Sequence, residues 1–131
     1  MSELFAGAPP LGIVALPQDG RLVAAAAGVR LLSVDLGTVV DKASLMDVLV
    51  RELELPGYFG RNWDALLDVL TDEGIVGDRA ALVLSGLTAL AGRAPGVADT
   101  LGEVMAAAQE DSAATGRSLW LVDADQEPVT G

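Results

Sequence analysis

The chain has 131 residues, with 19 acidic and 8 basic side chains, a formal net charge of −11, and neither cysteine nor histidine. This length suits one domain whose core needs no disulfide or metal to hold it. The missing residue types exclude disulfide frameworks, thiolate zinc sites and Ser-His-Asp or Cys-His catalysis. The negative charge disfavours direct nucleic-acid binding, which needs clustered Lys and Arg, and favours a basic protein as partner.

Residues 1–28 form an N-terminal extension without recognisable chemistry. Residues 1–10 are expected to be disordered or loosely attached, and they lack the basic and apolar regions of a signal peptide. The apolar run 11–16, ended by Pro17, predicts an extra edge strand, residues 18–20 a turn, and residues 21–27 a short helix that stops at Gly28. Because no apolar run approaches the roughly 18 to 20 residues of a membrane span, we expect a soluble, cytoplasmic protein.

Residues 29–123 alternate short apolar strands with helical patterns, and residues 124–131 form a polar tail. Strands are predicted at 29–35, 80–85 and 118–122, separated by about four helices. Such an order predicts an α/β fold with a small three-stranded parallel sheet. Asp41 or Ser44 is expected to cap one helix, with Ser44 and Asp47 as a weak capping box, and Asp99 or Thr100 another.

The stretch 55–72 reads as a rigid loop that leads into an acidic helix. Pro56 pushes the preceding residue out of helical conformation, while Gly57 and Gly60 permit tight turns on either side of Tyr58. Asn62 is a good N-cap for the helix that follows. Residues 73–78 are then expected to form a loop.

At helical spacing the residues after Asn62 form two stripes. The apolar stripe, which is expected to face the core, contains Trp63, Leu66, Leu67 and Leu70. The acidic stripe contains Asp64, Asp68 and Asp72, four residues apart. A solvated polar face is one interpretation of this row. The other is a carboxylate ridge with an apolar edge at Leu67, which suits a cationic partner.

Catalysis and metal binding by the aspartate row are disfavoured. Aspartates four apart on an exposed helix stay hydrated and ionised, whereas a glycosidase pair needs a raised pKa and a calcium loop needs alternate residues around glycine. The chain also lacks the glycine-rich phosphate-binding motifs. We therefore expect neither an enzyme nor a metal or cofactor site.

The run Leu-Pro-x-Tyr-Phe-Gly-x-Asn-x-Asp-Ala-Leu-x-Asp-x-Leu-Thr at 55–71 resembles the signature segment of the barstar family, intracellular inhibitors of barnase-type ribonucleases. The resemblance extends more loosely over residues 29–123 and implies a barstar-like fold. It implies an antitoxin or immunity protein, monomeric when free, whose partner is a basic extracellular-type ribonuclease or a toxin nuclease domain. A barstar-fold interaction module with a non-nuclease partner is the alternative.

The resemblance also implies which residues contact the partner. Tyr58 takes the place of the loop tyrosine, Asn62 that of the helix-starting asparagine, and Asp64 and Asp68 those of the two helix aspartates, with Asp68 as the dominant contact. Leu67 replaces a tryptophan common in barstar itself, which leaves the identity of the nuclease open. A further acidic contact on the last helix falls on Asp111 or, with another alignment, on Glu110. Arg61 could partly neutralise the ridge by pairing with Asp64.

Overall fold

Four parallel strands form one sheet in the order β1-β4-β3-β2 in the computed structural model, which describes residues 4–5, 7–16 and 19–125 apart from the side chains of residues 21 and 22. The strands are β1 (Ile13–Ala15), β2 (Arg30–Asp35), β3 (Arg79–Ser85) and β4 (Ser118–Asp123). The three strands predicted within residues 29–123 all form. The sheet nevertheless has four strands rather than three, because the expected edge strand joins it as β1, with Ile13 opposite Leu121 of β4.

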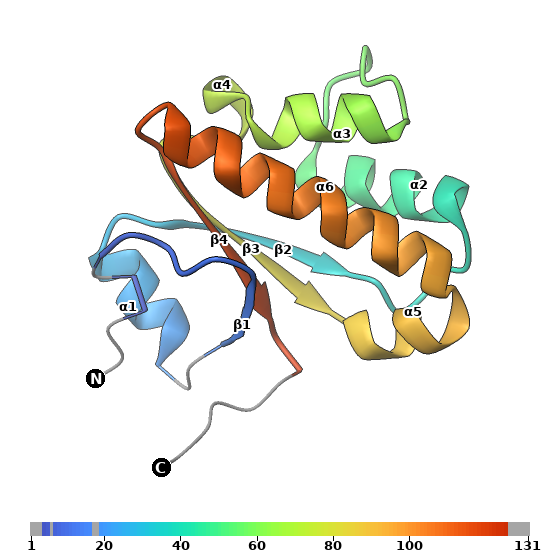
Figure 1. Ribbon diagram of the computed structural model, residues 1–131, viewed down its shortest axis with the longest axis horizontal. Coiled ribbons are helices and arrows are strands. Elements are labelled where there is room, and N and C mark those ends of the chain that lie inside the picture. The colour runs from blue at the N-terminus through green and yellow to red at the C-terminus, as the bar shows by residue number, and fades with distance from the viewer. Residues whose placement is uncertain (1–3, 6, 17–18, 126–131) are drawn as a thin grey trace.

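In the described part of the chain, helices cover both faces of the sheet, most of them on one face (Figure 1). The larger group contains α2 (Lys42–Leu53), α3 (Trp63–Leu70), α4 (Glu73–Val76), α5 (Leu87–Arg93) and α6 (Pro95–Ala114), and α1 (Gly20–Ala26) covers the opposite face. The additional helix, α4, is a single turn in the stretch predicted to be a loop. It forms because Asp72 caps it, with the side chain accepting a hydrogen bond from the Gly74 N–H.

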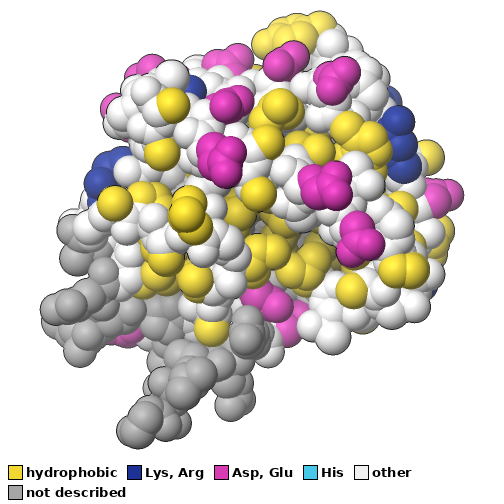
Figure 2. Space-filling model, viewed as in Figure 1, with side chains coloured by type: hydrophobic (Ala, Val, Ile, Leu, Met, Phe, Trp, Pro, Cys, Tyr) yellow, Lys and Arg dark blue, Asp and Glu magenta, His cyan; other side chains and the backbone are white. Residues whose placement is uncertain are grey.

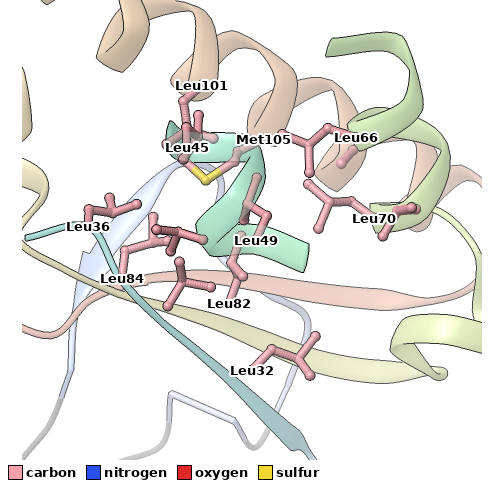
Figure 3. Packing of buried hydrophobic residues seen from close by; sticks show 14 of the residues in the cluster. Leu32, Leu36, Leu45, Leu49, Leu66, Leu70, Leu82, Leu84, Leu101 and Met105 are labelled. Carbon is pink, nitrogen blue, oxygen red and sulfur yellow. The ribbon is translucent and has the colours of Figure 1, made fainter. Parts of the chain in front are cut away.

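The larger core fills the space between the sheet and the five helices. Leu66 and Leu70 of α3 point toward Met105 of α6 and the leucines of α2 (Figure 3). One face of α3 is therefore buried in the larger core, and the opposite face is exposed to solvent or to a partner.

Helix α2 starts after Asp41, one of its two predicted caps, but its capping box and the start of α6 differ from the predictions. The capping box of α2 is formed by Asp41 and Ser44, each side chain accepting from the other residue's backbone N–H, and not by Ser44 and Asp47. The helix α6 begins at Pro95, ahead of the predicted Asp99 or Thr100. Proline is well tolerated in the first helical turn, where its missing N–H has no intrahelical partner to lose.

A smaller core lies on the other face of the sheet, and the N-terminal segment closes it. Phe5, expected in a loosely attached stretch, is completely buried and packs edge-on against Trp120 with 5.2 Å between ring centroids. The Trp120 indole donates to the Leu4 carbonyl (2.9 Å) and Arg79 donates to the Phe5 carbonyl (3.0 Å). The segment is held because β3 and β4 are apolar on both faces and need a second covering layer.

Some predicted features fall outside the described residues: most of the polar tail, at 126–131, and residues 17–18 of the predicted turn. Within the part of the chain that is described, no helix combines the length and the apolar character that crossing a membrane requires.

Candidate functional site

The loop between α2 and α3 is anchored at both ends and presents one aromatic side chain outward. Leu55 and Phe59 are buried, and the Phe59 N–H donates to the Pro56 carbonyl (3.0 Å), which closes a turn. Tyr58, between Gly57 and Phe59 in this turn, is 80% exposed. An aromatic side chain this exposed on an anchored turn is an unusual surface feature and a candidate contact for a partner.

Asn62 starts α3, as predicted. Its side-chain oxygen accepts from the Ala65 N–H (2.7 Å) and its amide donates to the Gly60 carbonyl (3.3 Å). A Cβ on residue 60 would lie 3.1 Å from this amide, so glycine allows the loop to pass close to the cap. Asn62 thus fixes the direction of α3 relative to the loop, a role inside the fold that is separate from any contact with a partner.

Arg61 does not neutralise the acidic row. Its guanidinium pairs with the Asp47 carboxylate of α2 and makes no ion pair with Asp64. The pair ties the loop to α2 and directs the positive charge away from the row. The backbone of Arg61 has a positive φ of 53°, which turns the chain between Gly60 and Asn62.

Asp64 and Asp68 are exposed on α3, and in the described residues no cation or hydrogen-bond donor pairs with either carboxylate. Asp64 stands in the first helical turn, where the helix dipole favours a negative charge. Asp68 stands near the other end, where the dipole disfavours it, and no basic residue lies in that last turn. Both carboxylates are therefore available to cations of a partner.

Asp72 does not complete a three-residue row on α3. The helix ends at Leu70, with Thr71 as its C-cap, and Asp72 is the N-cap of α4. The prediction of one continuous acidic helix was wrong because the capping interaction with Gly74 begins a new helix at this point. Asp72 still stays close to Asp68, but on a different element.

A surface hollow of about 140 Å³ joins the loop to these aspartates. Loop residues form one side, α3 the other and α4 the end. The lining residues are Tyr58, Phe59, Gly60, Ala65, Asp68, Val69, Asp72 and Ile75. The hollow thus brings together three predicted site residues, Tyr58, Asp68 and Asp72, and leaves Asp64 outside.

The face over α3 and α6 carries several acidic side chains among hydrophobic ones, with basic side chains only toward its margins (Figure 2). Glu110 and Asp111 of α6 are both exposed. The preceding Gln109 reaches Gly12 and Pro10 on the β1 side of α6. Asp111 follows Gln109 by two residues, which is about 200° round the helix, and therefore lies on the side of α6 that faces α3. Glu110 lies between the β1 side and the α3 side.

Leu67 is half-buried and packs against the larger core at the edge of the acidic surface. It therefore contributes less exposed apolar area than its position at the border of the two stripes suggested.

Negative charge is also concentrated at α4. A hydrogen bond with the Asp78 carboxyl and repulsion between the two like charges raise the pKa of Glu73, and the nearby Arg117 partly opposes the shift.

Sequence patterns did not identify Phe59 and Ile75 as walls of the hollow, nor the pairing of Glu73 with Asp78. Glu73 follows the capping Asp72, a local signal for a helix start that would have placed α4. No group of three or more acidic side chains suited to a metal ion occurs among residues 4–5, 7–16 and 19–125. The arrangement is an acidic hollow with an exposed tyrosine at its edge.

Residues 29–124 match the family model described as Barstar (barnase inhibitor). No curated protein matches the chain. The match covers the sheet strands β2, β3 and β4, the helices α2 to α6 and the whole of the hollow, and it leaves β1 and α1 outside.

Proposed function

Because the chain belongs to the barstar family, we propose that it inhibits a basic ribonuclease by filling the nuclease active site with α3 and the loop before it. The observation that carries the proposal is the pair of exposed carboxylates of Asp64 and Asp68, which have no partner among the described residues, on the helix that follows the exposed Tyr58. Asn62, Phe59 and the Arg61–Asp47 ion pair hold in place the loop and the helix α3 that carry these three residues.

The partner's chemistry follows from what a ribonuclease must do. Its active site holds RNA phosphates with basic side chains, so a rigid set of carboxylates competes for the same groups. Inhibition then results from occupancy, and the inhibitor catalyses no reaction and needs no cofactor. Asp68 is the contact from which we expect the largest share of the binding energy, with Asp64, Tyr58, Leu67, Asp72 and Asp111 around it.

Charge supports the same proposal. A net charge of −11 speeds encounter with a basic protein and disfavours binding to RNA itself. We propose that the protein acts in the cytoplasm as a monomer that protects its producer, as an antitoxin or immunity protein does, against an extracellular-type ribonuclease or a toxin nuclease domain.

A barstar-fold interaction module with a non-nuclease partner is the second candidate. The observation that favours it is Leu67, a half-buried residue at the position where a tryptophan is common in barstar itself. A smaller apolar contact there is compatible with a partner other than a barnase-type ribonuclease.

Inhibition of RNA hydrolysis tests the proposal directly. A small panel of basic microbial ribonucleases is assayed with increasing amounts of the protein, and at least one should lose its activity at a fixed molar ratio. Asp68→Ala should restore hydrolysis at the same ratio, while Asp99→Ala, which removes an exposed charge of α6, should not. Undiminished hydrolysis by every nuclease would favour the interaction module.

A further inference from the structure

The C-terminal end of α3 has no cation of its own and receives one from a distant part of the chain. No basic residue lies in the last turn of α3, and Thr71 is its C-cap. The Thr71 carbonyl accepts a hydrogen bond from the guanidinium of Arg117, which lies where α6 ends, next to the end of α3 (Figure 1). Carbonyls at the end of a helix have no partner within it, and the helix dipole favours a positive charge there. Arg117 thus satisfies a need that the sequence of α3 leaves open.

The end of α6 fixes the position of Arg117. The Arg117 N–H donates to the Ser112 carbonyl (2.8 Å), and the Gly116 N–H donates to the Ala113 carbonyl (3.2 Å). With Gly116 at a φ of 79°, these two bonds form the Schellman motif that ends many helices. The Arg117 Nε also donates to the Thr115 hydroxyl (3.0 Å). Because β4 begins at the next residue, Arg117 reaches α3 from a junction that is held by both α6 and the sheet.

Thr71 connects this junction to the acidic part of α3. The Thr71 hydroxyl donates to the Leu67 carbonyl (2.9 Å) and to the Asp68 carbonyl (3.2 Å). The carbonyl that Arg117 holds belongs to the peptide group between Thr71 and Asp72, where α3 ends and α4 is capped. The bond from Arg117 therefore fixes the last turn of α3, which carries Asp68.

The charge of Arg117 acts in the opposite direction. Arg117 is close enough to Glu73 of α4 to oppose the rise in the pKa of that carboxyl. A positive charge at this place weakens the attraction between an acidic surface and a basic partner. On charge alone, the loss of Arg117 would therefore strengthen binding, whereas loss of its hydrogen bond to α3 would weaken it. The sign of the effect separates the two roles.

We infer that Arg117 is a positioning residue for inhibition, which holds the end of α3 in the orientation that the bound partner requires, although its charge opposes that partner. The inference rests on the proposed function, since the orientation of α3 matters only to a partner that α3 binds. It gives a role in binding to a residue that lies outside α3 and outside the loop before it.

Hydrogen exchange of backbone amides tests the local part of the inference without a nuclease. The N–H groups of Thr71 and Asp72 donate to the carbonyls of Leu67 and Val69, so their exchange reports on opening of this end of α3. We expect Arg117→Ala to speed their exchange about tenfold, because a hydrogen bond to a charged group changes an equilibrium by at least about that factor. The amides of β3 should keep their exchange rates. Arg117→Lys, which retains the charge and a donor, should restore part of the protection.

Binding kinetics test the functional part, with a ribonuclease that the wild-type chain inhibits. Arg117→Ala should speed dissociation by about the same tenfold factor. Association should be unchanged or faster, because the acidic surface loses a positive charge. Arg51→Ala is the matched control, since it removes an exposed arginine of α2 that pairs with its neighbour Glu52. It should leave dissociation unchanged.

Combination with Asp68→Ala separates positioning from a general loss of stability. If Arg117 acts by placing Asp68, Arg117→Ala should change dissociation by less than about twofold in the Asp68→Ala background, whereas a variant that is only destabilised would show the same effect in both backgrounds.

Unchanged exchange at Thr71 and Asp72, unchanged or slower dissociation of Arg117→Ala, or an equal tenfold effect in both backgrounds would overturn the inference. A wild-type chain that inhibits no ribonuclease would instead contradict the proposed function. The exchange experiment would then decide by itself whether Arg117 holds the end of α3.

Discussion

Replacing Phe5 by alanine tests whether the N-terminal segment is an integral part of the fold. Phe5 is completely buried against Trp120, Val23 and Ala24 in the smaller core, and its carbonyl accepts from Arg79. Truncating a buried phenylalanine costs about 3 to 5 kcal/mol, which includes the loss of an edge-on aromatic pair. The loss of stability cannot exceed the free energy that holds the segment to the sheet, because a segment near the end of the chain can detach while the rest of the domain stays folded.

We therefore expect Phe5→Ala to lower the free energy of unfolding by about 3 kcal/mol, at the lower end of that range. Urea unfolding followed by tryptophan fluorescence measures it, since Trp120 lies beside the lost ring. Leu11→Ala is the matched control: Leu11 belongs to the same segment but is 80% exposed, so its loss should stay within about 0.5 kcal/mol. A loss below about 1 kcal/mol for Phe5→Ala would mean that the segment is not needed to cover β3 and β4.

Three further predictions concern helix caps and one tight turn within residues 29–124. Asn62→Ala removes the acceptor of the Ala65 N–H and should cost about 1 kcal/mol in urea unfolding; an unchanged midpoint would mean that α3 does not depend on this cap. Gly86→Ala should cost more than about 1 kcal/mol in thermal unfolding, because residue 86 has a φ of 79° and its Cβ would lie 3.2 Å from the Gly37 nitrogen; a stabilised variant would contradict that geometry. Hydrogen bonds from Ser44 lower the pKa of Asp41 below 3.8, so its stabilising contribution is present above that value and is lost as the pH falls through the folded-state pKa. Asp41→Asn should therefore reduce the acid-induced fall in melting temperature, and an identical pH profile would argue against this contribution.

Local signals predicted the parts of the structure that depend on neighbouring residues. Asn62 is the N-cap of α3 because the side chain and the N–H that it accepts from are three residues apart, and such a pattern is visible in the sequence. The strands β3 and β4 were predicted for a similar reason, since their continuous apolar runs are typical of parallel strands buried on both faces.

Features that depend on distant residues could not be predicted in this way. Arg61 has two acidic candidates, and only the path of the loop decides that it pairs with Asp47 of α2. The burial of Phe5 depends on Trp120, which is 115 residues away in the chain. Apolar strands imply that some segment covers them, but the pattern does not say which one.

The end of α3 illustrates a different limit. Helical periodicity continues through Asp72, so the acidic stripe predicted one helix with three aspartates. The structure ends α3 at Leu70 because Thr71 and Asp72 satisfy backbone groups in another way, Thr71 by donating to the Leu67 carbonyl and Asp72 by capping α4. Threonine and aspartate compete with helix propagation through such local bonds, and periodicity does not include this competition.

Calorimetric titration of the protein and its Asp68→Ala variant against a ribonuclease that it inhibits tests the central claim most directly. The account predicts tight binding of the wild-type chain, a loss of several kcal/mol for Asp68→Ala, as expected when one partner of a buried charge pair is removed, and almost no change for Asp99→Ala. The urea midpoint of Asp68→Ala should stay close to that of the wild type, because its carboxylate has no partner among the described residues. Equal affinity of Asp68→Ala and the wild-type chain would contradict the account, since the acidic surface of α3 would then not be the interface.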